Sequence, residues 1–321
     1  MKPLVLITNR FDGGLKAKLS QMPEADFRYQ ADLFSDEALL QKTNGLICRS
    51  GTTIDKDALN KLPELQFLVT ATAGFDHIDL KACVEKGIKV FHTPEAQSLA
   101  AAELTIAMML TTQRKWQQAT EQVRSGEWNR SLILGRQLQG QKLGIIGYGR
   151  VGSLVAKKAK ALGLEVFGYD PYLKENPQEI TMLGFEELMR TVDIVSLHVP
   201  KTKITRHMIK KETLEWMNTE STLINMSRGD VINEADLCEH LMENLKFTAG
   251  LDVYASEPLV KKSPLQSLKN VVLTPHVGAS TEEALRQSSE LALQKMILLL
   301  SGETPQDGEL PPKALWWEDE I

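Results

Sequence analysis

The sequence predicts an α/β fold with two doubly wound parallel sheets. Short apolar runs alternate with amphipathic segments along the chain, a pattern typical of parallel strands joined by helical crossovers. At 321 residues the chain exceeds the usual size of one compact core, so we expect two domains. Lys and Arg number 37 against 42 Asp and Glu, which gives a net charge of −5, and no basic tract is present. We therefore expect no nucleic-acid or membrane partner.

The first hundred residues contain the strands of one predicted sheet. The apolar runs are Leu4–Thr8, Gly45–Cys48, Gln66–Val69 and Lys89–His92, with a weaker run near Phe27. Helical patterns lie between them at Asp55–Lys61 and Asp79–Lys86, and Gly87 is placed to end the second of these helices.

A long Ala- and Leu-rich helix, predicted from Ser98 to about Gln118, leads into a second region. Six strand candidates follow it, at Lys142–Ile146, Glu165–Tyr169, Asp193–Leu197, Thr222–Asn225, Phe247–Gly250 and Val271–Leu273. Six strands with intervening helices match a doubly wound dinucleotide-binding domain. A last helix is predicted over Thr281–Ser301, and the tail beyond it either docks through Trp316 and Trp317 or stays loose.

The three cysteines, Cys48, Cys83 and Cys238, are far apart and lack CxxC spacing. We interpret them as reduced thiols of a cytoplasmic protein rather than as disulfide partners or zinc ligands, and we expect no metal site.

The strongest local motif is a GxGxxG turn between the apolar run Lys142–Ile146 and a helical segment. Gly147 allows the tight turn, Gly149 lets the backbone approach a pyrophosphate, and Gly152 lets the helix pack on the strand. Asp170 follows Gly152 by 18 residues, at the end of the next strand, where an acidic residue binds the ribose hydroxyls. The carboxylate favours NAD over NADP, although Arg150 could also lie near the adenosine ribose.

Three later segments place chemically able residues just after strands of the same region. Arg228 offers a planar fork that matches a carboxylate, and His276 titrates near neutrality and can give or take a proton. Glu257 can hold the other imidazole nitrogen and raise the pKa of the ring. Carboxyl ends of parallel strands meet at one edge of a sheet, so reduction of a 2-keto acid there is the chemistry that these residues predict.

At these residues the sequence resembles the D-isomer-specific 2-hydroxyacid dehydrogenases over nearly its whole length. The resemblance is carried by GYGRVG, YDP at Tyr169–Pro171, NMSRG, LDVYASEP and LTPHVGAST. It implies that Arg228, Glu257 and His276 are catalytic. The cofactor residues that it and the glycine motif imply are Gly147, Gly149, Arg150, Val151, Gly152, Asp170, His198, Val199, Pro200, Thr205, Met226, Ser227, Asp252 and Gly278, and the cofactor is NAD.

The resemblance also implies the domain organisation. A Rossmann cofactor domain, residues 99–284, is inserted in a flavodoxin-like substrate domain formed by residues 1–98 and 285–321. A homodimer formed through the cofactor domain is implied as well, in which the arm from Trp116 to Trp128 could take part.

Two loops of the first region are expected to contact a small anionic 2-hydroxy or 2-keto acid. Small residues at Ala73 and Gly74 would let backbone N–H groups close around a carboxylate. Arg49 and Ser50 suit a phosphate or a second carboxylate, and they resemble the corresponding pair in 3-phosphoglycerate dehydrogenases. The TATAG-x-DH-x-D run looks more like erythronate-4-phosphate dehydrogenases. The segment Thr93–Gln97 departs from many relatives, because Glu and Gln replace Gly and Asn.

Several alternatives stay open. If Arg49 is a solvated residue at a strand end, the protein is a glyoxylate or hydroxypyruvate reductase. Formate dehydrogenases share the fold but have glutamine where Glu257 stands. A third alternative is that the protein is not an enzyme but an NAD-sensing binding protein. The set of Arg228, Glu257 and His276 argues against this alternative.

Overall fold

The computed structural model describes residues 2–312, which form two compact units. One unit consists of residues 2–98 and 279–312, and the other of residues 99–278. The chain returns to the first unit at Ala279 rather than at the expected position 285. The reason is that the turn ending at Gly278 is hydrogen-bonded to Asp252 of the second unit, whereas the last helix belongs wholly to the first. Trp316 and Trp317 lie outside the described residues.

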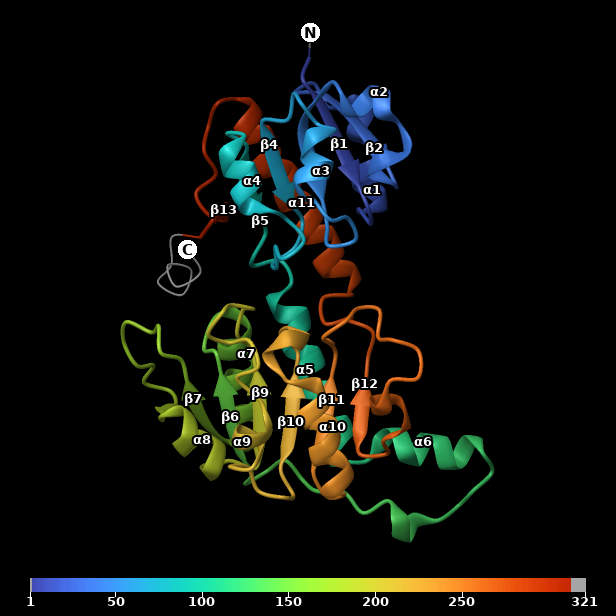
Figure 1. Cartoon of the computed structure of the whole chain (residues 1–321), viewed down its shortest axis with the longest axis vertical. Helices are drawn as coiled ribbons and strands as arrows, with labels where there is room; N and C mark the ends of the chain where they lie inside the picture. Colours follow the sequence, from blue (N-terminus) through green and yellow to red (C-terminus); the bar gives the residue numbers. More distant parts are fainter. Residues whose placement is uncertain (1, 313–321) are drawn as a thin grey trace. The chain divides into compact units, whose positions relative to one another are not determined.

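The first unit is built on a six-stranded sheet (Figure 1). Its strands are β1 (Leu4–Thr8), β2 (Asp26–Gln30), β3 (Thr43–Cys48), β4 (Phe67–Thr70), β5 (Lys89–His92) and β13 (Glu309–Leu310). The order is β13-β5-β4-β3-β1-β2, in which β1 to β5 are parallel and β13 is antiparallel to β5. Without β13 this is the 2-1-3-4-5 order of flavodoxin-like sheets, as predicted.

Helices cover both faces of this sheet. They are α1 (Gly13–Lys16), α2 (Glu37–Leu40), α3 (Lys56–Asn60), α4 (Leu80–Glu85) and α11 (Glu282–Leu300), with short 3₁₀ turns at Leu19–Gln21 and Leu33–Ser35. Alternate strand residues face opposite layers, so Val5 and Ile7 pack against Met296 of α11, whereas Leu6 packs on the other side with Leu59 of α3. Gly87, with φ +69°, ends α4 as expected.

The second unit is built on a seven-stranded parallel sheet. Its strands are β6 (Lys142–Ile146), β7 (Glu165–Tyr169), β8 (Thr181–Met182), β9 (Ile194–Leu197), β10 (Thr222–Asn225), β11 (Thr248–Leu251) and β12 (Val271–Leu273). The order β12-β11-β10-β9-β6-β7-β8 is the 3-2-1-4-5-6 arrangement of a Rossmann sheet with one strand added. The predicted six strands are all present. β8, which supplies the third strand of that order, was not predicted, and the strand added to the six is β12 at the edge beside β11.

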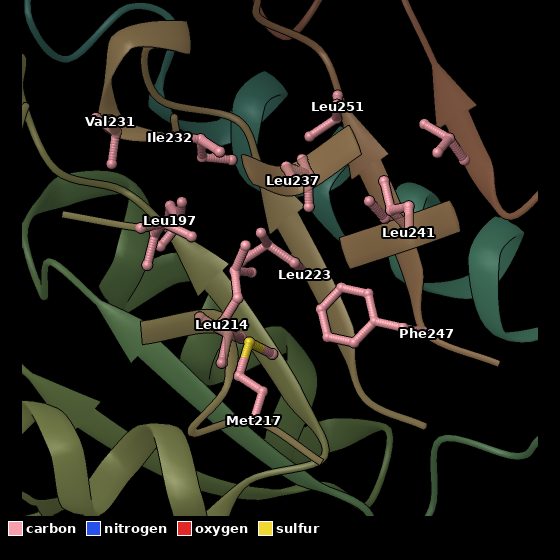
Figure 2. Close-up of a cluster of buried hydrophobic side chains, with 14 of the residues drawn as sticks. Leu197, Leu214, Met217, Leu223, Val231, Ile232, Leu237, Leu241, Phe247 and Leu251 are labelled. Carbon is pink, nitrogen blue, oxygen red and sulfur yellow. The ribbon is translucent and has the colours of Figure 1, made fainter. Parts of the chain in front are cut away.

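Two helical layers enclose this sheet. The helices are α5 (Ser98–Gln113), α6 (Trp116–Arg124), α7 (Arg150–Ala161), α8 (Phe185–Thr191), α9 (Lys211–Leu214) and α10 (Glu234–Glu243), with 3₁₀ turns at Arg130–Leu132, Gly229–Val231 and Pro264–Ser267. Met108 of α5 and Val155 of α7 pack with Ile145 on one face. On the other face Leu223 packs among the leucines of α9 and α10 and Phe247 (Figure 2).

The predicted continuous helix to Gln118 is wrong. Lys115 adopts a left-handed conformation with φ +49°, which ends α5 and lets α6 start in a new direction. None of the α6 residues is buried, and the helix extends away from the sheet of its own unit (Figure 1). Within residues 2–312, no helix combines the length and the apolarity that a membrane crossing requires.

Candidate active site

The turn between β6 and α7 leaves an open space at the start of the helix. Gly147 has φ +91°, and a Cβ on it would lie 2.7 Å from the carbonyl oxygen of His198. A Cβ on Gly152 would lie 2.1 Å from the carbonyl oxygen of Gly147, so strand and helix touch there. A Cβ on Gly149, the N-cap of α7, would meet no atom within 4 Å. This open helix N-terminus fits a phosphate, because its N–H groups lack intrahelical partners.

Asp170 lies directly against this turn. Its carboxylate accepts hydrogen bonds from the N–H groups of Tyr148, at 3.0 Å, and Tyr172, also at 3.0 Å. Arg150 is exposed at the first position of α7, and Val151 packs partly into the core. The structure therefore groups the glycine turn, Arg150, Val151 and Asp170 at one edge of the sheet.

The end of β9 lies next to the same turn. The Nε2 atom of His198 is 2.8 Å from the hydroxyl of Ser196, whereas its buried Nδ1 atom has no partner among the described residues. Burial lowers the pKa of His198 to about 3, so the ring is neutral. Val199 packs against Gly147. A neutral ring with an unpaired buried nitrogen beside the glycine turn fits a residue that lines a cofactor.

Thr205 lies in the loop that follows β9, close to Pro200. Its hydroxyl donates to the carbonyl oxygen of Pro200 at 2.6 Å and accepts from the N–H of Thr202 at 2.9 Å. The side chain is 9% exposed and bonds within its own loop, so it fixes the loop that carries Pro200.

Asn225, at the end of β10, organises the loop that carries Arg228. Its buried side chain donates to the carbonyl oxygen of Arg228 at 2.9 Å and accepts from the N–H of Ser227 at 3.0 Å and from its hydroxyl at 2.8 Å. Met226 and Ser227 of this loop were predicted from the sequence, whereas Asn225 was not. The available signal was an asparagine directly after a buried strand, where its side chain can bond the backbone of the following turn.

Gly229 joins this loop to the one that carries Glu257. A Cβ on Gly229 would lie 1.9 Å from the carbonyl carbon and oxygen of Tyr254. Only glycine allows this approach, and it places the Arg228 loop directly on the Glu257 loop.

Asp252 fixes the turn that carries His276 through hydrogen bonds. Its carboxylate is 1% exposed and accepts from the hydroxyl of Thr274 (2.6 Å) and the N–H groups of Val277 (2.8 Å) and Gly278 (2.7 Å). Asp252 and Gly278 are two of the residues that the resemblance implies at the cofactor. In the structure they hold each other, and the buried carboxylate fixes the path of the turn.

His276 and Glu257 form a close pair at this edge. The Nδ1 atom of His276 lies 2.5 Å from one carboxylate oxygen of Glu257, and the other oxygen accepts from the N–H of Tyr254 at 3.1 Å. His276 has φ +51°, a conformation in which a histidine is strained. Since Glu257 holds Nδ1, the ring directs Nε2 away from the pair, where a substrate can reach it.

The pair shifts the pKa values of both partners. The hydrogen bond that the Glu257 carboxylate accepts from Nδ1 raises the pKa of His276 above its ordinary value, against the opposing effect of burial. Burial acts to raise the pKa of Glu257, but the hydrogen bond and charge of His276 outweigh it and lower the pKa. The charge of Arg228 reaches both groups, while its guanidinium donates to the carbonyl oxygen of Ser227 at 2.7 Å. A cation and a proton-transfer pair therefore share one edge of the sheet.

Arg49 and Ser50 follow β3 in the first unit. The backbone N–H of Arg49 donates to the Asn9 side chain at 3.1 Å, and its guanidinium donates to the hydroxyl of Ser288 on α11 at 2.8 Å. Burial and the charge of Arg10 lower the pKa of Arg49. Arg49 is thus a partly buried, anchored cation and not a freely solvated side chain, whereas Ser50 is exposed.

Ala73 and Gly74 lie in the neighbouring loop after β4. The N–H of Ala73 donates to the side chain of Gln97 at 2.6 Å, and its carbonyl oxygen contacts Nδ1 of His92 at 2.7 Å. The expected open N–H at Ala73 is therefore occupied in this structure. No acceptor for the Gly74 N–H is present among residues 2–312. The same part of the chain contains no cluster of His, Cys, Asp or Glu that could hold a metal ion.

Residues 106–278 match the family model described as the NAD-binding domain of D-isomer specific 2-hydroxyacid dehydrogenases. The chain is 40% identical to a D-3-phosphoglycerate dehydrogenase of Methanocaldococcus jannaschii over 84% of its own length and 53% of that protein. It is 35% identical to a glyoxylate reductase of Thermococcus litoralis, covering 95% of this chain and 96% of the reductase. The chain thus spans about half the length of the first relative and nearly all of the second.

The fold of the chain is also similar to that of a solved structure. The D-lactate dehydrogenase of Aquifex aeolicus, complexed with NAD and lactic acid, superposes with a TM-score of 0.86 at 29% identity. The match covers 97% of this chain and all of the other.

Proposed function

The chain belongs to the D-isomer specific 2-hydroxyacid dehydrogenase family and carries its NAD-binding domain, and we propose that it transfers a hydride reversibly between NAD(H) and a small 2-hydroxy or 2-keto acid. The observation that carries the proposal is the 2.5 Å contact between His276 and Glu257 within range of the Arg228 charge. This arrangement combines a carboxylate anchor with an acid and base for the carbinol oxygen.

Each catalytic side chain has one task. Arg228 binds the substrate carboxylate through its planar fork, which orients the neighbouring carbonyl. During reduction, Nε2 of His276 gives its proton to the carbonyl oxygen as the carbon gains the hydride, and the imidazole is left neutral. During oxidation, the same nitrogen takes the hydroxyl proton. Glu257 stabilises the protonated ring and so raises the pKa of the proton donor above its ordinary value.

The glycine turn would hold the cofactor, which when bound as NADH supplies the hydride. The open N-terminus of α7 would bind the pyrophosphate. Asp170 would accept hydrogen bonds from the adenosine ribose, and His198 with Val199 would line the site beside Gly147. Asn225, Gly229 and Asp252 are positioning residues, because they fix the three catalytic loops through the backbone.

We propose further that the substrate carries a phosphate, as 3-phosphoglycerate does. Support comes from Arg49, a partly buried cation beside Arg10, because such a group is costly without an anion. The family relatives have names that differ on this point, since phosphoglycerate dehydrogenases, a glyoxylate reductase and a hydroxypyruvate reductase all match. The hydrogen bond from Arg49 to Ser288 favours the unphosphorylated alternative, because it uses part of the guanidinium.

A substrate panel tests both levels of the proposal. Oxidation by NAD would be compared for 3-phosphoglycerate and 4-phosphoerythronate, and reduction by NADH for glyoxylate and hydroxypyruvate, in the wild type and in Arg49→Gln. A phosphate-binding role predicts a preference for a phosphorylated acid that Arg49→Gln removes. A clear preference for glyoxylate would reject the phosphate while leaving the dehydrogenase proposal standing. Binding of NAD(H) without turnover of any acid would favour the non-catalytic, NAD-sensing alternative.

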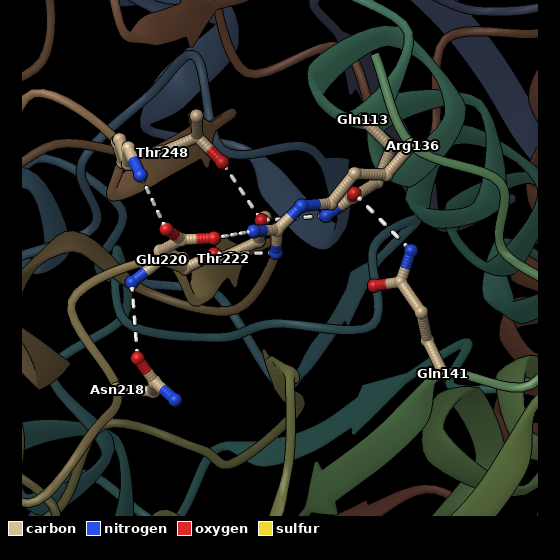
Figure 3. A network of polar contacts seen from close by, with 8 residues as sticks. Gln113, Arg136, Gln141, Asn218, Glu220, Thr222 and Thr248 are labelled. Carbon is tan, nitrogen blue, oxygen red and sulfur yellow. Dashed lines mark hydrogen bonds and ion pairs between the residues drawn. The ribbon is translucent and has the colours of Figure 1, made fainter.

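We also propose that the chain forms a homodimer through the cofactor unit. The predicted arm and the few residues after it, here taken together as residues 114–135, expose Trp116, Trp128 and Leu134. The exposed fractions of the last two are 79% and 81%. Both ends of the arm are tied to the body: Gln113 donates to Thr222 at 2.7 Å, and Arg136 pairs with Glu220, which also binds Lys246 (Figure 3). A hollow of about 680 Å³ lies beside these anchors. An anchored arm with exposed tryptophans fits a protein contact better than a solvated surface.

A cytoplasmic location is proposed on the three free cysteines, all of which are buried. Burial raises the pKa of Cys48 to about 12 and that of Cys83 to about 11, which keeps these thiols protonated. Free thiols of this kind are typical of a reducing compartment. Fractionation of the source cells would test the location.

A further inference from the structure

Gln97 binds the loop formed by residues 71–74, called here the substrate loop, at two backbone positions. Its carboxamide oxygen accepts from the N–H of Ala73 at 2.6 Å, and its carboxamide nitrogen donates to the carbonyl oxygen of Ala71 at 3.0 Å. The side chain is 6% exposed, so both polar atoms depend on these bonds. A single amide therefore spans the two peptide groups that precede Gly74.

Neighbouring side chains hold the rest of this loop. The carbonyl oxygen of Ala73 contacts Nδ1 of His92, and that of Gly74 accepts from the hydroxyl of Thr72 at 2.7 Å. Among the described residues, nothing accepts from the Gly74 N–H. The loop thus presents the Gly74 N–H while Gln97 occupies the N–H of Ala73.

We propose that Gln97 is a positioning residue that decides which backbone donor this loop offers to the substrate carboxylate. By binding Ala71 and Ala73 together, it withholds the Ala73 N–H and orients the Gly74 N–H as the donor. This inference rests on the proposed function, because it concerns the affinity for the acid. Gln97 does not touch the reacting atoms, so its effect lies in substrate binding and not in hydride transfer.

The length of the side chain matters. The segment Thr93–Gln97 has glutamine where the resemblance leads one to expect asparagine, and the shorter amide would lack one methylene with which to span both peptide groups. Gln97 also comes just before Leu99, the first residue of the second unit. The end of the crossing segment is thereby hydrogen-bonded to the substrate loop within the first unit.

The variant Gln97→Glu tests this arrangement through pH. An ionised carboxylate still accepts from Ala73 but repels the Ala71 carbonyl oxygen, whereas a protonated carboxyl can accept and donate as the amide does. We expect KM for the acid to rise about tenfold at pH 8.5 and to return to within about twofold of the wild type near pH 6, since burial raises a carboxyl pKa. We expect kcat and the Kd of NADH to stay within about twofold throughout.

Two further variants separate positioning from general damage. Gln97→Met keeps the size and lacks both polar atoms, so its KM should be raised at every pH. Gln41→Glu, at an exposed glutamine of the same unit, should match the wild type. Wild-type measurements at each pH correct for titration of His92, Glu95 and His276.

Two results would overturn the inference, and each is distinct from failure of the proposed function. If the wild type reduces keto acids and both Gln97 variants retain wild-type KM at pH 8.5, the inference is wrong and the function stands. If the wild type shows no turnover, the proposed function fails, and hydrogen exchange over residues 71–74 still decides the role of Gln97. Faster exchange in Gln97→Met supports its hold on the loop, and unchanged exchange rejects it.

Discussion

Gly229 lies against the carbonyl group of Tyr254 so closely that any Cβ would come within 1.9 Å of it. Through this contact the loop that carries Arg228 rests on the loop that carries Glu257. The relative placement of the carboxylate anchor and the proton-transfer pair therefore depends on the absence of a single methyl group.

Replacing Gly229 by alanine should damage stability and activity together. The overlap involves backbone atoms that no change of rotamer can relieve, so we expect a loss of about 3 kcal/mol or more in the free energy of unfolding. Thermal unfolding and kcat/KM would be measured together. Gly184→Ala is the matched control, because a Cβ there meets no atom and φ is −65°. Equal stability of the two variants would show that the loops are not in contact.

The pH dependence of reduction should follow His276. Because Glu257 raises the pKa of the ring above its ordinary 6.5, kcat/KM for reduction should be highest below that raised value and fall as pH rises through it. Glu257→Gln removes the charge, so the fall should move to lower pH. A profile that is identical in the variant would contradict the role given to Glu257.

The contribution of the His276–Glu257 pair to folding stability should depend on pH. Stability from the raised pKa of His276 is fully present below 6.5 and is lost as pH rises through the raised value. Stability from the lowered pKa of Glu257 is present above 4.5 and is lost as pH falls through the lowered value. The contribution should therefore be largest between these limits, and small because both side chains are partly exposed. Tm in the wild type and in Glu257→Gln should differ most near pH 6, and a difference that is constant with pH would contradict the coupling.

Arg228 should not tolerate lysine. Lysine keeps the charge and loses the two-pronged geometry, so we expect kcat/KM for the keto acid to fall about 100-fold in Arg228→Lys while NADH binding is kept. Arg190→Lys, at an exposed arginine of α8 paired with Glu186, is the control. Wild-type kinetics in Arg228→Lys would remove Arg228 from the carboxylate site.

Asp170 should decide the preference between the two nicotinamide cofactors. Asp170→Asn keeps an acceptor for the Tyr148 N–H and removes the charge that repels a 2′-phosphate. We expect the ratio of kcat/KM for NADPH to that for NADH to rise about tenfold. An unchanged ratio would point to Arg150 or another residue as the determinant.

Charges placed on the arm should separate the dimer. Trp128→Glu and Leu134→Glu would put carboxylates on the exposed apolar surface, and light scattering coupled to gel filtration should then give the mass of a monomer. Val84→Glu, at an exposed valine of α4 in the other unit, is the control and should keep the wild-type mass. A wild type that is itself monomeric would reject the proposal.

The sequence predicted strands well because most of them are continuous apolar runs. β1, β5, β6, β7, β10 and β12 have the expected bounds. β8 and β13 were missed because each has two residues, too few for a periodic pattern. The break at Lys115 was missed as well, because its left-handed backbone has no glycine or asparagine to announce it.

The site was harder to predict than the fold. Residues whose chemistry is direct, such as Arg228 and His276, could be selected from their place after strands. Asp252 and Gln97 act through backbone groups of other loops, and those partners become visible only when the chain is folded. Local sequence patterns hold no record of such contacts.

The most direct test of the proposed function is NADH oxidation by the wild type and by His276→Ala with a panel of 2-keto acids, followed by nicotinamide absorbance. We expect turnover with at least one acid, a fall in kcat of about 100-fold or more in the variant, and unchanged NADH binding. Full activity in His276→Ala, or NADH binding by the wild type with no turnover of any acid, would contradict it.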